Sequence, residues 1–380
     1  MILATKAPKT SWILWQRRID CSRLTDLQRK LQVFLFLFGI KMLMEQPGGN
    51  SVAQRSRAKI LEQEIIPYLA LSLQEPMRSL PEKIKDSTLE IRLRVGRPVM
   101  LVCDAEDVVL TKIGMLSEDK MRQTIQFITR SSVYACEEEL RQGFITLPGG
   151  HRVGLVGQAI LERGSIRTIK HISGLNIRLA KQIIGAADFV LPYLILNKSF
   201  ISTLIVSPPG CGKTTLLRDL VRQLSYGVPS LCLKGYKVGV VDERSEIAAC
   251  FRGVPQNNVG PRTDVLDGAG KIEGIMMLLR SMSPEIIATD EVGSAGDITA
   301  LEEALVSGVE LIATSHGDGI DDLVSRPLLA QLTERRLFGR IVFLGLSQGV
   351  GTIESIYNGY SLQPVYTYKA DKAEQLEGKK

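Results

Sequence analysis

A glycine-rich segment between an apolar run and a helical stripe constrains this 380-residue chain more than any other feature. The apolar run, residues 204–206, comes directly before the segment. Behind it, apolar side chains recur at the spacing of one helix face: Leu216, Leu217, Leu220, Val221 and Leu224. We predict that the residues between bind a nucleotide; they are Ser207, Pro208, Pro209, Gly210, Cys211, Gly212, Lys213, Thr214 and Thr215. Strand, glycine turn and helix in this order predict a parallel α/β sheet with a ligand at the carboxyl end of the strand.

The segment matches the phosphate-loop pattern at its last residues, with Ser207 where the first glycine is usual. Gly210 and Gly212 allow backbone N–H groups to turn inward around phosphate oxygens, and the following helix adds its positive end. We expect Lys213 to be an exposed charge that reaches the β- and γ-phosphates of ATP, and the Thr214 hydroxyl to hold Mg²⁺. The alternative is a glycine-rich turn without function, but the strand-turn-helix context favours nucleotide binding.

A second apolar run, residues 286–289, ends in Asp290 and Glu291. We expect Asp290 to complete the Mg²⁺ shell and Glu291 to act as the base that polarises an attacking water. An Asp-Glu pair is common on protein surfaces, so the signal depends on its place at a strand end. A base directed at water favours hydrolysis over a kinase reaction.

Two further apolar runs end in polar groups. Residues 238–241 precede Asp242, Glu243 and Arg244, and residues 311–314 lead to His316. Ligands bind at the carboxyl edge of such sheets. We therefore predict a catalytic role for Glu243 and a role for His316 as sensor of the γ-phosphate or the water. For His316 the alternative is a capping or core histidine.

Several arginines lie near the acidic strand ends, where the alternative role is ordinary surface solvation. Arg244 and Arg280 are candidates to act on the nucleotide of their own chain, and we predict a catalytic role for Arg280. Arg252 and Arg262 belong to a Gly/Pro-rich loop around residues 253–270 that we expect to reach a neighbouring subunit. Because an arginine supplied in trans stabilises the charge of phosphoryl transfer, we predict a homo-oligomeric ring, a hexamer, with shared ATP sites.

The pattern divides the chain into four parts: an extension over residues 1–57, an α+β domain over 58–185, a P-loop ATPase domain over 186–360 and a charged tail over 361–380. In the second part, residues 89–95 and 99–102 predict strands, 121–128 a helix and 144–156 a hairpin. In the third, short β-branched runs without alternation indicate a sheet covered on both faces. A last run at 341–344 and the segment 360–368 predict an edge hairpin.

The opening 43 residues differ from the rest of the chain. They hold eight Lys or Arg and two Asp, so they carry the whole formal charge of +6 and leave a neutral body. A neutral body argues against sequence-independent nucleic-acid binding. The apolar run at 33–40 is too short to cross a bilayer. Three interpretations stay open: an over-extended start, a disordered or membrane-skimming arm, and a true anchor.

Composition excludes several classes of protein. Apolar residues make up 44% and charged residues 23%, which excludes collagen-like, disordered and multi-span membrane chains. The six cysteines form no C-x-x-C pair and lie far in sequence from the three histidines, so we predict no zinc site. Reduced thiols in a cytosolic protein are the expected state.

Several segments together resemble the stage III sporulation protein AA family, over roughly residues 58–360. The segments are 90–98 (EIRLRVGRP), 143–157 (GFITLPGGHRVGLVG), 207–219 (SPPGCGKTTLLRD), 241–248 (VDERSEIA) and 279–292 (LRSMSPEIIATDEV). That family is similar to the type II and type IV secretion ATPases. The resemblance implies a RecA- or AAA-like doubly wound sheet behind a smaller α+β domain. It also makes Asp242 and Glu243 equivalent to the acidic box of those ATPases, and residues 314–317 to their histidine box.

The resemblance further implies an ATPase of endospore-forming bacteria. It would lie in the mother-cell cytoplasm, peripheral to the membrane, and act with other stage III sporulation membrane proteins in a channel between mother cell and forespore. One alternative is a RecA-like ATPase that binds or remodels nucleic acid, against which the neutral body argues. A small-molecule kinase is a third possibility, but the sequence shows no lid segment for one.

Overall fold

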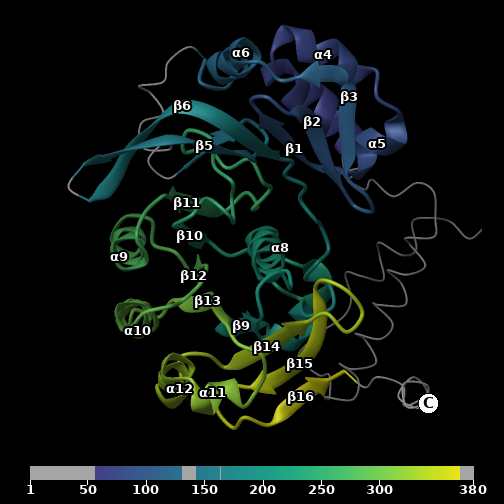
Figure 1. Ribbon diagram of the computed structural model, residues 1–380. Coiled ribbons are helices and arrows are strands. Elements are labelled where there is room, and N and C mark those ends of the chain that lie inside the picture. Colours follow the sequence, from purple (N-terminus) through teal and green to yellow (C-terminus); the bar gives the residue numbers. More distant parts are fainter. Residues whose placement is uncertain (1–55, 131–142, 163, 369–380) are drawn as a thin grey trace, which may run out of the picture.

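The computed structural model describes residues 56–130, 143–162 and 164–368. Within them the chain forms two large sheets, one in each half of the molecule (Figure 1). The predicted extension lies almost wholly outside the described residues, as does the part of the predicted tail beyond residue 368. Among the residues described, no helix is both long enough and apolar enough to cross a membrane.

Short helices open the first half. The chain runs through α3 (Arg57–Ile60), a π-helical turn η2 (Leu61–Ile65), a 3₁₀ turn η3 (Ile66–Tyr68), α4 (Leu71–Arg78) and α5 (Glu82–Ser87). Pro67 lies in the 3₁₀ turn where the first helical stretch ends, whereas Pro76 is accommodated inside α4. These helices and α6 (Glu118–Ile128) pack on the sheet around fully buried Leu61, Ile65 and Met77.

The first sheet is antiparallel throughout, in the order β3-β2-β1-β6-β5-β4. Its strands are β1 (Thr88–Arg94), β2 (Pro98–Cys103), β3 (Val108–Met115), β4 (Phe144–Leu147), β5 (His151–Glu162) and β6 (Ser165–Arg178). The predicted strands at 89–95 and 99–102 and the hairpin at 144–156 are confirmed. Sequence reasoning missed β3, whose apolar residues are interrupted by Thr111 and Lys112 and are half-buried or exposed, and β6, in which polar residues recur along most of the length.

The second sheet has the order β11-β10-β12-β13-β9-β14-β15-β16. Its parallel strands are β9 (Thr203–Ser207), β10 (Val238–Asp242), β11 (Thr263–Asp267), β12 (Ile286–Thr289), β13 (Glu310–His316) and β14 (Arg340–Gly345), and β15 (Thr352–Asn358) and β16 (Pro364–Thr367) are antiparallel additions. The four predicted buried strands are confirmed. Instead of an edge hairpin at 341–368, β14 pairs in parallel with β9 inside the sheet.

The predicted charged tail begins too early. Residues 364–367 form β16, and Tyr366 packs its ring 5.1 Å from Phe189 and 5.7 Å from Tyr193. These aromatic contacts join the end of the second sheet to the segment that leads into it.

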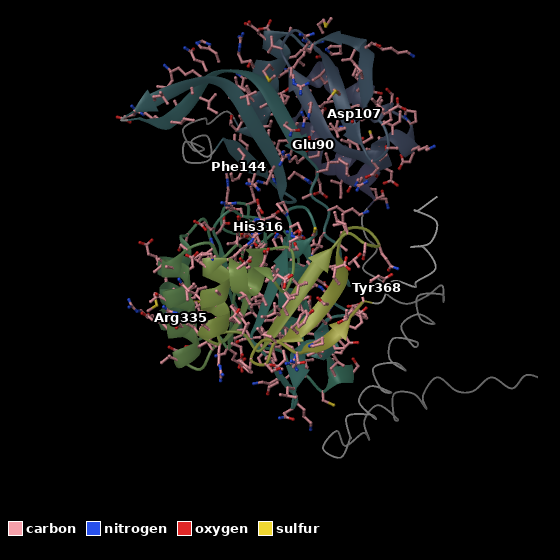
Figure 2. The ribbon with its side chains drawn as sticks, turned by 60° about the horizontal axis from the view of Figure 1, so that its bottom comes forward. Glu90, Asp107, Phe144, His316, Arg335 and Tyr368 are labelled. Carbon is pink, nitrogen blue, oxygen red and sulfur yellow. The ribbon has the colours of Figure 1, made fainter. Side chains whose placement is uncertain are left out.

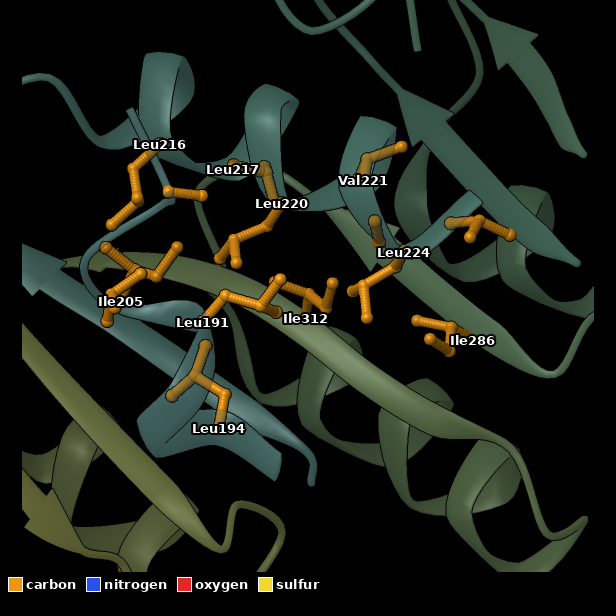
Figure 3. Packing of buried hydrophobic residues seen from close by; sticks show 14 of the residues in the cluster. Leu191, Leu194, Ile205, Leu216, Leu217, Leu220, Val221, Leu224, Ile286 and Ile312 are labelled. Atoms are coloured by element: carbon orange, nitrogen blue, oxygen red, sulfur yellow. The ribbon is translucent and has the colours of Figure 1, made fainter. Parts of the chain in front are cut away.

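Helices cover both faces of the second sheet (Figure 1). One face carries α8 (Lys213–Tyr226), and the other carries α9 (Lys271–Ser281), α10 (Ala295–Val306) and α12 (Pro327–Glu334), with short α11 (Asp322–Ser325) beside the last. The predicted stripe of α8, from Leu216 to Leu224, packs on Ile205, Ile286 and Ile312 (Figure 3). This arrangement confirms the doubly wound α/β class with a smaller α+β unit ahead of it.

The two halves meet at the turn between β4 and β5. Gly149 N–H donates to Gln256 Oε1 at 2.9 Å, and Arg152 Nη1 lies 2.9 Å from Glu246 Oε1. Gly150 has φ of 81°, and a Cβ there would lie 2.7 Å from the Cβ of Ala249. Only glycine allows the backbone to come this close to Ala249. This close contact packs the first half against the loop that follows β10.

Among the cysteines that the structure describes, Cys232 differs from expectation. Cys103, Cys211 and Cys250 are free, as predicted, but Cys232 is disulfide-bonded. The expectation of reduced thiols is therefore wrong for Cys232.

Candidate nucleotide-binding site

The glycine-rich segment forms a tight turn between β9 and α8. Gly210 has φ of 78° and Gly212 has φ of 91°, values at which any side chain is strained. Gly212 is also the residue that precedes the first turn of α8. The predicted glycine turn at a helix N-terminus is thus present, and a turn of this kind can offer backbone N–H groups to an anion.

Lys213 begins α8 but is not the exposed charge that the sequence suggested, since only 8% of it is exposed. Its Nζ donates to the carbonyl oxygens of Ser207 (3.0 Å) and Pro208 (3.2 Å). Burial lowers the pKa of Lys213, and the nearby Asp290 carboxylate partly opposes that shift. The ammonium group is therefore bonded to its own loop, at a position where phosphate oxygens would be stronger partners than neutral carbonyls.

The acidic pair lies where β12 ends. Asp290 Oδ2 accepts a hydrogen bond from Thr214 Oγ1 at 3.1 Å, and its other oxygen accepts one from Thr314. Thr314 Oγ1 also accepts from the N–H of Glu291 at 2.8 Å. The Thr214 hydroxyl and the Asp290 carboxylate are adjacent hard oxygen ligands, the type that Mg²⁺ prefers. Thr314 is a positioning residue that the sequence suggested only through its place in the histidine box.

His316 connects Lys213 to the carboxylate of Glu291. It stands on β13, which lies between β9 and β12, and pairs in register with Ser207. Its Nδ1 lies 3.1 Å from Lys213 Nζ and its Nε2 lies 3.2 Å from Glu291 Oε1. Because the lysine can only donate, Nδ1 accepts and Nε2 carries the proton toward Glu291. Figure 2 shows His316 at the side of the second half that faces the first.

Glu291 is held from a second side by Arg244. Arg244 Nη1 lies 2.8 Å from Glu291 Oε2. The backbone of Glu291 has φ of 46°, an uncommon conformation for this residue type. Both carboxylate oxygens thus have cationic or polar partners, and the group is oriented rather than free in solvent.

These side chains surround one pocket of about 390 Å³. Its lining consists of Pro209, Gly210, Gly212, Lys213, Thr214, Thr215, Glu246, Asp290, Glu291, His316 and Val350. The structure brings together most of the predicted site residues. Ser207, Pro208 and Cys211 do not line the pocket and instead shape the turn behind it. Glu246 and Val350 are lining residues that sequence reasoning missed.

Two predicted catalytic residues lie elsewhere. Glu243 forms an ion pair with Lys271 and lines a smaller adjoining hollow together with Arg244 and Glu291. Arg280 is an exposed residue in the last turn of α9 and does not line either space. Because α9 begins beside the hollow at Lys271 and runs away from it, its last turn is remote from the pocket.

The loop around residues 253–270 is not free along its length. It contains β11, which pairs with β10, and Arg262 is anchored through Nη1 to the carbonyl of Ser225 at 2.9 Å. Arg252 remains exposed, with its guanidinium 5.4 Å from the ring centre of Phe251. Among the residues described, no carboxylate forms an ion pair with Arg252. Of the two predicted trans arginines, only Arg252 is thus available.

Asp242 is a structural carboxylate. It is almost fully buried, and its two oxygens accept hydrogen bonds from the N–H groups of Glu246, Ile247 and Ala248 at 2.8–3.2 Å. Burial raises the pKa of this carboxyl group, while the backbone donors oppose that shift. Arg218 donates to the carbonyls of Glu246 and Ile247 on the same loop. Together they fix the loop that carries Glu246 to the pocket.

Replacing Asp242 by alanine is expected to destabilise the second half. The change leaves buried N–H groups without an acceptor, which costs about 2–4 kcal/mol. Thermal melting followed by circular dichroism measures the loss. Glu243→Ala is the matched control, because it removes only an ion pair at the surface, worth at most about 1 kcal/mol. Equal shifts in Tm for the two variants would contradict the structural role of Asp242.

The strand, the glycine turn and the acidic strand end define a P-loop nucleotide-binding fold. The chain belongs to the family described as sporulation stage III, protein AA, whose model matches residues 60–362. It is 44% identical over 295 residues to stage III sporulation protein AA of Bacillus subtilis, which covers 78% of this chain and 94% of that protein. It is also 29% identical over 160 residues to the protein SEEDLING PLASTID DEVELOPMENT 1 of Arabidopsis thaliana, covering 42% of this chain and 22% of that protein.

Solved structures with a similar fold include an ATPase and a pilus retraction motor. The ATPase DotB of Legionella pneumophila is 17% identical with a TM-score of 0.46, covering 69% of this chain and 73% of that one. The pilus retraction motor PilT with bound ADP is 16% identical with a TM-score of 0.48, covering 78% of this chain and 88% of that one. At these values the comparison describes a shared fold and nothing further.

Proposed function

We propose that this chain is a Mg²⁺-dependent ATPase that energises the assembly or operation of a secretion-like channel between mother cell and forespore during endospore formation. The observation that carries the enzymatic part is the convergence of Lys213, Thr214, Asp290, Glu291 and His316 on one pocket. The sporulation setting is supported by membership of the family and by the relative in Bacillus subtilis. The channel is the expectation that the family resemblance supplies.

The residues present fit both ATP and its metal. The turn with Gly210 and Gly212 leaves backbone N–H groups open to phosphate oxygens, and Thr214 and Asp290 offer a hydroxyl and a carboxylate side by side. When bound there, Mg²⁺ would neutralise negative charge on the β- and γ-phosphates. Lys213 would exchange its bonds to the loop carbonyls for bonds to phosphate oxygens, which are stronger because both partners are charged.

Glu291 is the residue that we propose to act on water. Its carboxylate lies at the pocket, oriented by Arg244 and His316, and can accept a proton from a water held against it. His316 touches both Lys213 and Glu291, so movement of the lysine toward a phosphate would remove the partner of Nδ1. In this way His316 would report the presence of a γ-phosphate to the base.

We also propose that the working form is a homo-oligomeric ring, a hexamer, in which Arg252 of one subunit completes the site of the next. Support comes from the exposure of Arg252 and from its missing carboxylate partner within the described part of the chain. An arginine supplied in trans raises the rate of phosphoryl transfer by about 10³–10⁵. The α+β half would provide much of the subunit contact.

Mixing inactive subunits tests the ring. Lys213→Ala and Arg252→Ala chains, each inactive alone, are expected to regain about a quarter of the wild-type ATPase rate when mixed equally, since that share of neighbours has both residues intact. Arg262→Ala is the control, because that side chain is anchored to its own chain and is not expected to reach the site of a neighbouring subunit. No recovery on mixing, together with full activity of a monomer, would contradict the shared site.

We further propose that the protein lies at the mother-cell side of the membrane, peripheral to it and bound to other stage III sporulation membrane proteins. A pull-down from sporulating cells with Glu291→Gln, which is expected to keep ATP bound, should recover those proteins. A filter-binding assay with single-stranded nucleic acid tests the RecA-like alternative. Tight, ATP-dependent retention of the nucleic acid would favour that alternative over the channel.

A further inference from the structure

The pocket has two chemically different ends. Asp290, Glu291 and His316 come from β12 and β13, on one side of β9 in the sheet. Val350 comes from the connection between β14 and β15, on the opposite side of β9. The first end is acidic and polar, and the second presents a branched apolar side chain. The glycine turn lies between the two ends.

Val350 is unusual among the lining residues because 72% of it is exposed although it is apolar. Its neighbours hold it in place. Gly349 and Gly351 have φ of 107° and 90°, and Thr352 Oγ1 donates to the carbonyl of Gly349 at 2.7 Å and accepts from the N–H of Gln348 at 3.2 Å. The connection is therefore a hydrogen-bonded turn that displays Val350 at its tip.

The tip lies against the phosphate-binding turn. A Cβ built on Gly212 would lie 3.4 Å from Val350 Cγ1 and 3.6 Å from the backbone of Gly351. An exposed apolar side chain at such a place is stabilised when a flat apolar surface covers it. Water alone provides no such surface.

The direction of a bound nucleotide follows from the two ends. Its terminal phosphate belongs beside Lys213 and Glu291, so its sugar and base must extend toward the end of the pocket away from these two residues. That path leads to Val350. A purine base is planar and apolar on both faces, which matches the chemistry of the side chain at this end.

We propose that Val350 and the two glycines that flank it, residues 349–351, form the nucleobase subsite of the pocket, with Val350 packing on a face of the purine ring. This inference rests on the proposed function, since it names the residues that would contact the base of the ATP bound in the same pocket. It makes Val350 a specificity-determining residue that distinguishes a nucleotide from a bare polyphosphate chain.

The test compares ATP with inorganic triphosphate, which has the phosphate chain but no base. Isothermal titration calorimetry with Mg²⁺ measures both affinities for wild-type protein and for Val350→Ala. Removing the two methyl groups is expected to weaken ATP binding by about fifteenfold, since each buried methyl group is worth about 0.8 kcal/mol. The affinity for triphosphate should stay within about twofold.

Leu346→Ala is the matched control, because Leu346 is an exposed apolar residue of the same turn that does not line the pocket. It should leave both affinities unchanged. Unchanged ATP affinity in Val350→Ala would overturn the subsite, as would equal losses for ATP and triphosphate, which would indicate damage to the phosphate turn. If the wild-type protein binds neither ligand, the proposed function itself fails.

Discussion

Lys213→Ala is expected to lose ATP binding, with Kd raised by about 100-fold or more. Hydrogen bonds from a charged donor are worth about 1.5–3 kcal/mol each, so the loss of two to phosphate oxygens costs about 3 kcal/mol or more and gives this range. The lysine is buried, but its partners are carbonyl oxygens of Ser207 and Pro208 beside an open pocket. Water can replace the ammonium group there, so the fold is expected to survive. Calorimetric titration with ATP measures the affinity, and a thermal melt checks the fold.

A matched lysine separates this effect from a general loss of positive charge. Lys271 stands beside the adjoining hollow, paired with Glu243, and does not line the main pocket. Lys271→Ala should therefore bind ATP with an affinity within about twofold of the wild-type value, because a screened charge outside the main pocket contributes little to binding. If Lys213→Ala binds ATP as wild-type protein does, the phosphate-loop assignment is wrong.

Glu291→Gln is expected to bind ATP normally but to hydrolyse it about 10²–10⁴ times more slowly, the usual contribution of a general base. The amide has the same shape, so the pocket is preserved, but it cannot accept the proton of the attacking water. Single-turnover release of phosphate from pre-bound ATP measures the chemical step apart from binding.

Glu243→Gln provides the comparison for the base. Glu243 is bonded to Lys271 and lies outside the main pocket, so its replacement should change turnover by less than about tenfold. Near-normal turnover in Glu291→Gln, with a large loss in Glu243→Gln, would transfer the role of base to Glu243.

Much of the site could be predicted from the sequence because it depends on local geometry. The glycine turn requires positive φ at Gly210 and Gly212, and the sequence places glycine at both positions. Short runs without alternation mark β9, β10, β12 and β13 as buried parallel strands. Residues at the carboxyl ends of such strands meet at one edge of the sheet, which is why the sequence identifies Asp290 and His316.

Other features depend on contacts that no local pattern reveals. The run at 341–344 has the composition of an edge strand as well as of β14, because its partner β9 lies far away in sequence. β11 carries two aspartates in five residues and so lacks the apolar run of a buried strand. The structural role of Asp242 rests on backbone donors brought under it by the following loop. The sequence predicts a catalytic role for Arg280 that the structure does not support, because nearness to Asp290 in sequence says nothing about the direction of α9.

Release of inorganic phosphate from Mg²⁺-ATP tests the central claim most directly. Wild-type protein and Lys213→Ala are purified identically and assayed at the same concentrations, over a range in which wild-type protein assembles. We predict steady release by wild-type protein, and release at least about 100-fold slower from the variant, since the latter lacks the residue that holds the transferred phosphate. No release by assembled wild-type protein, or equal release by both proteins, would contradict the account.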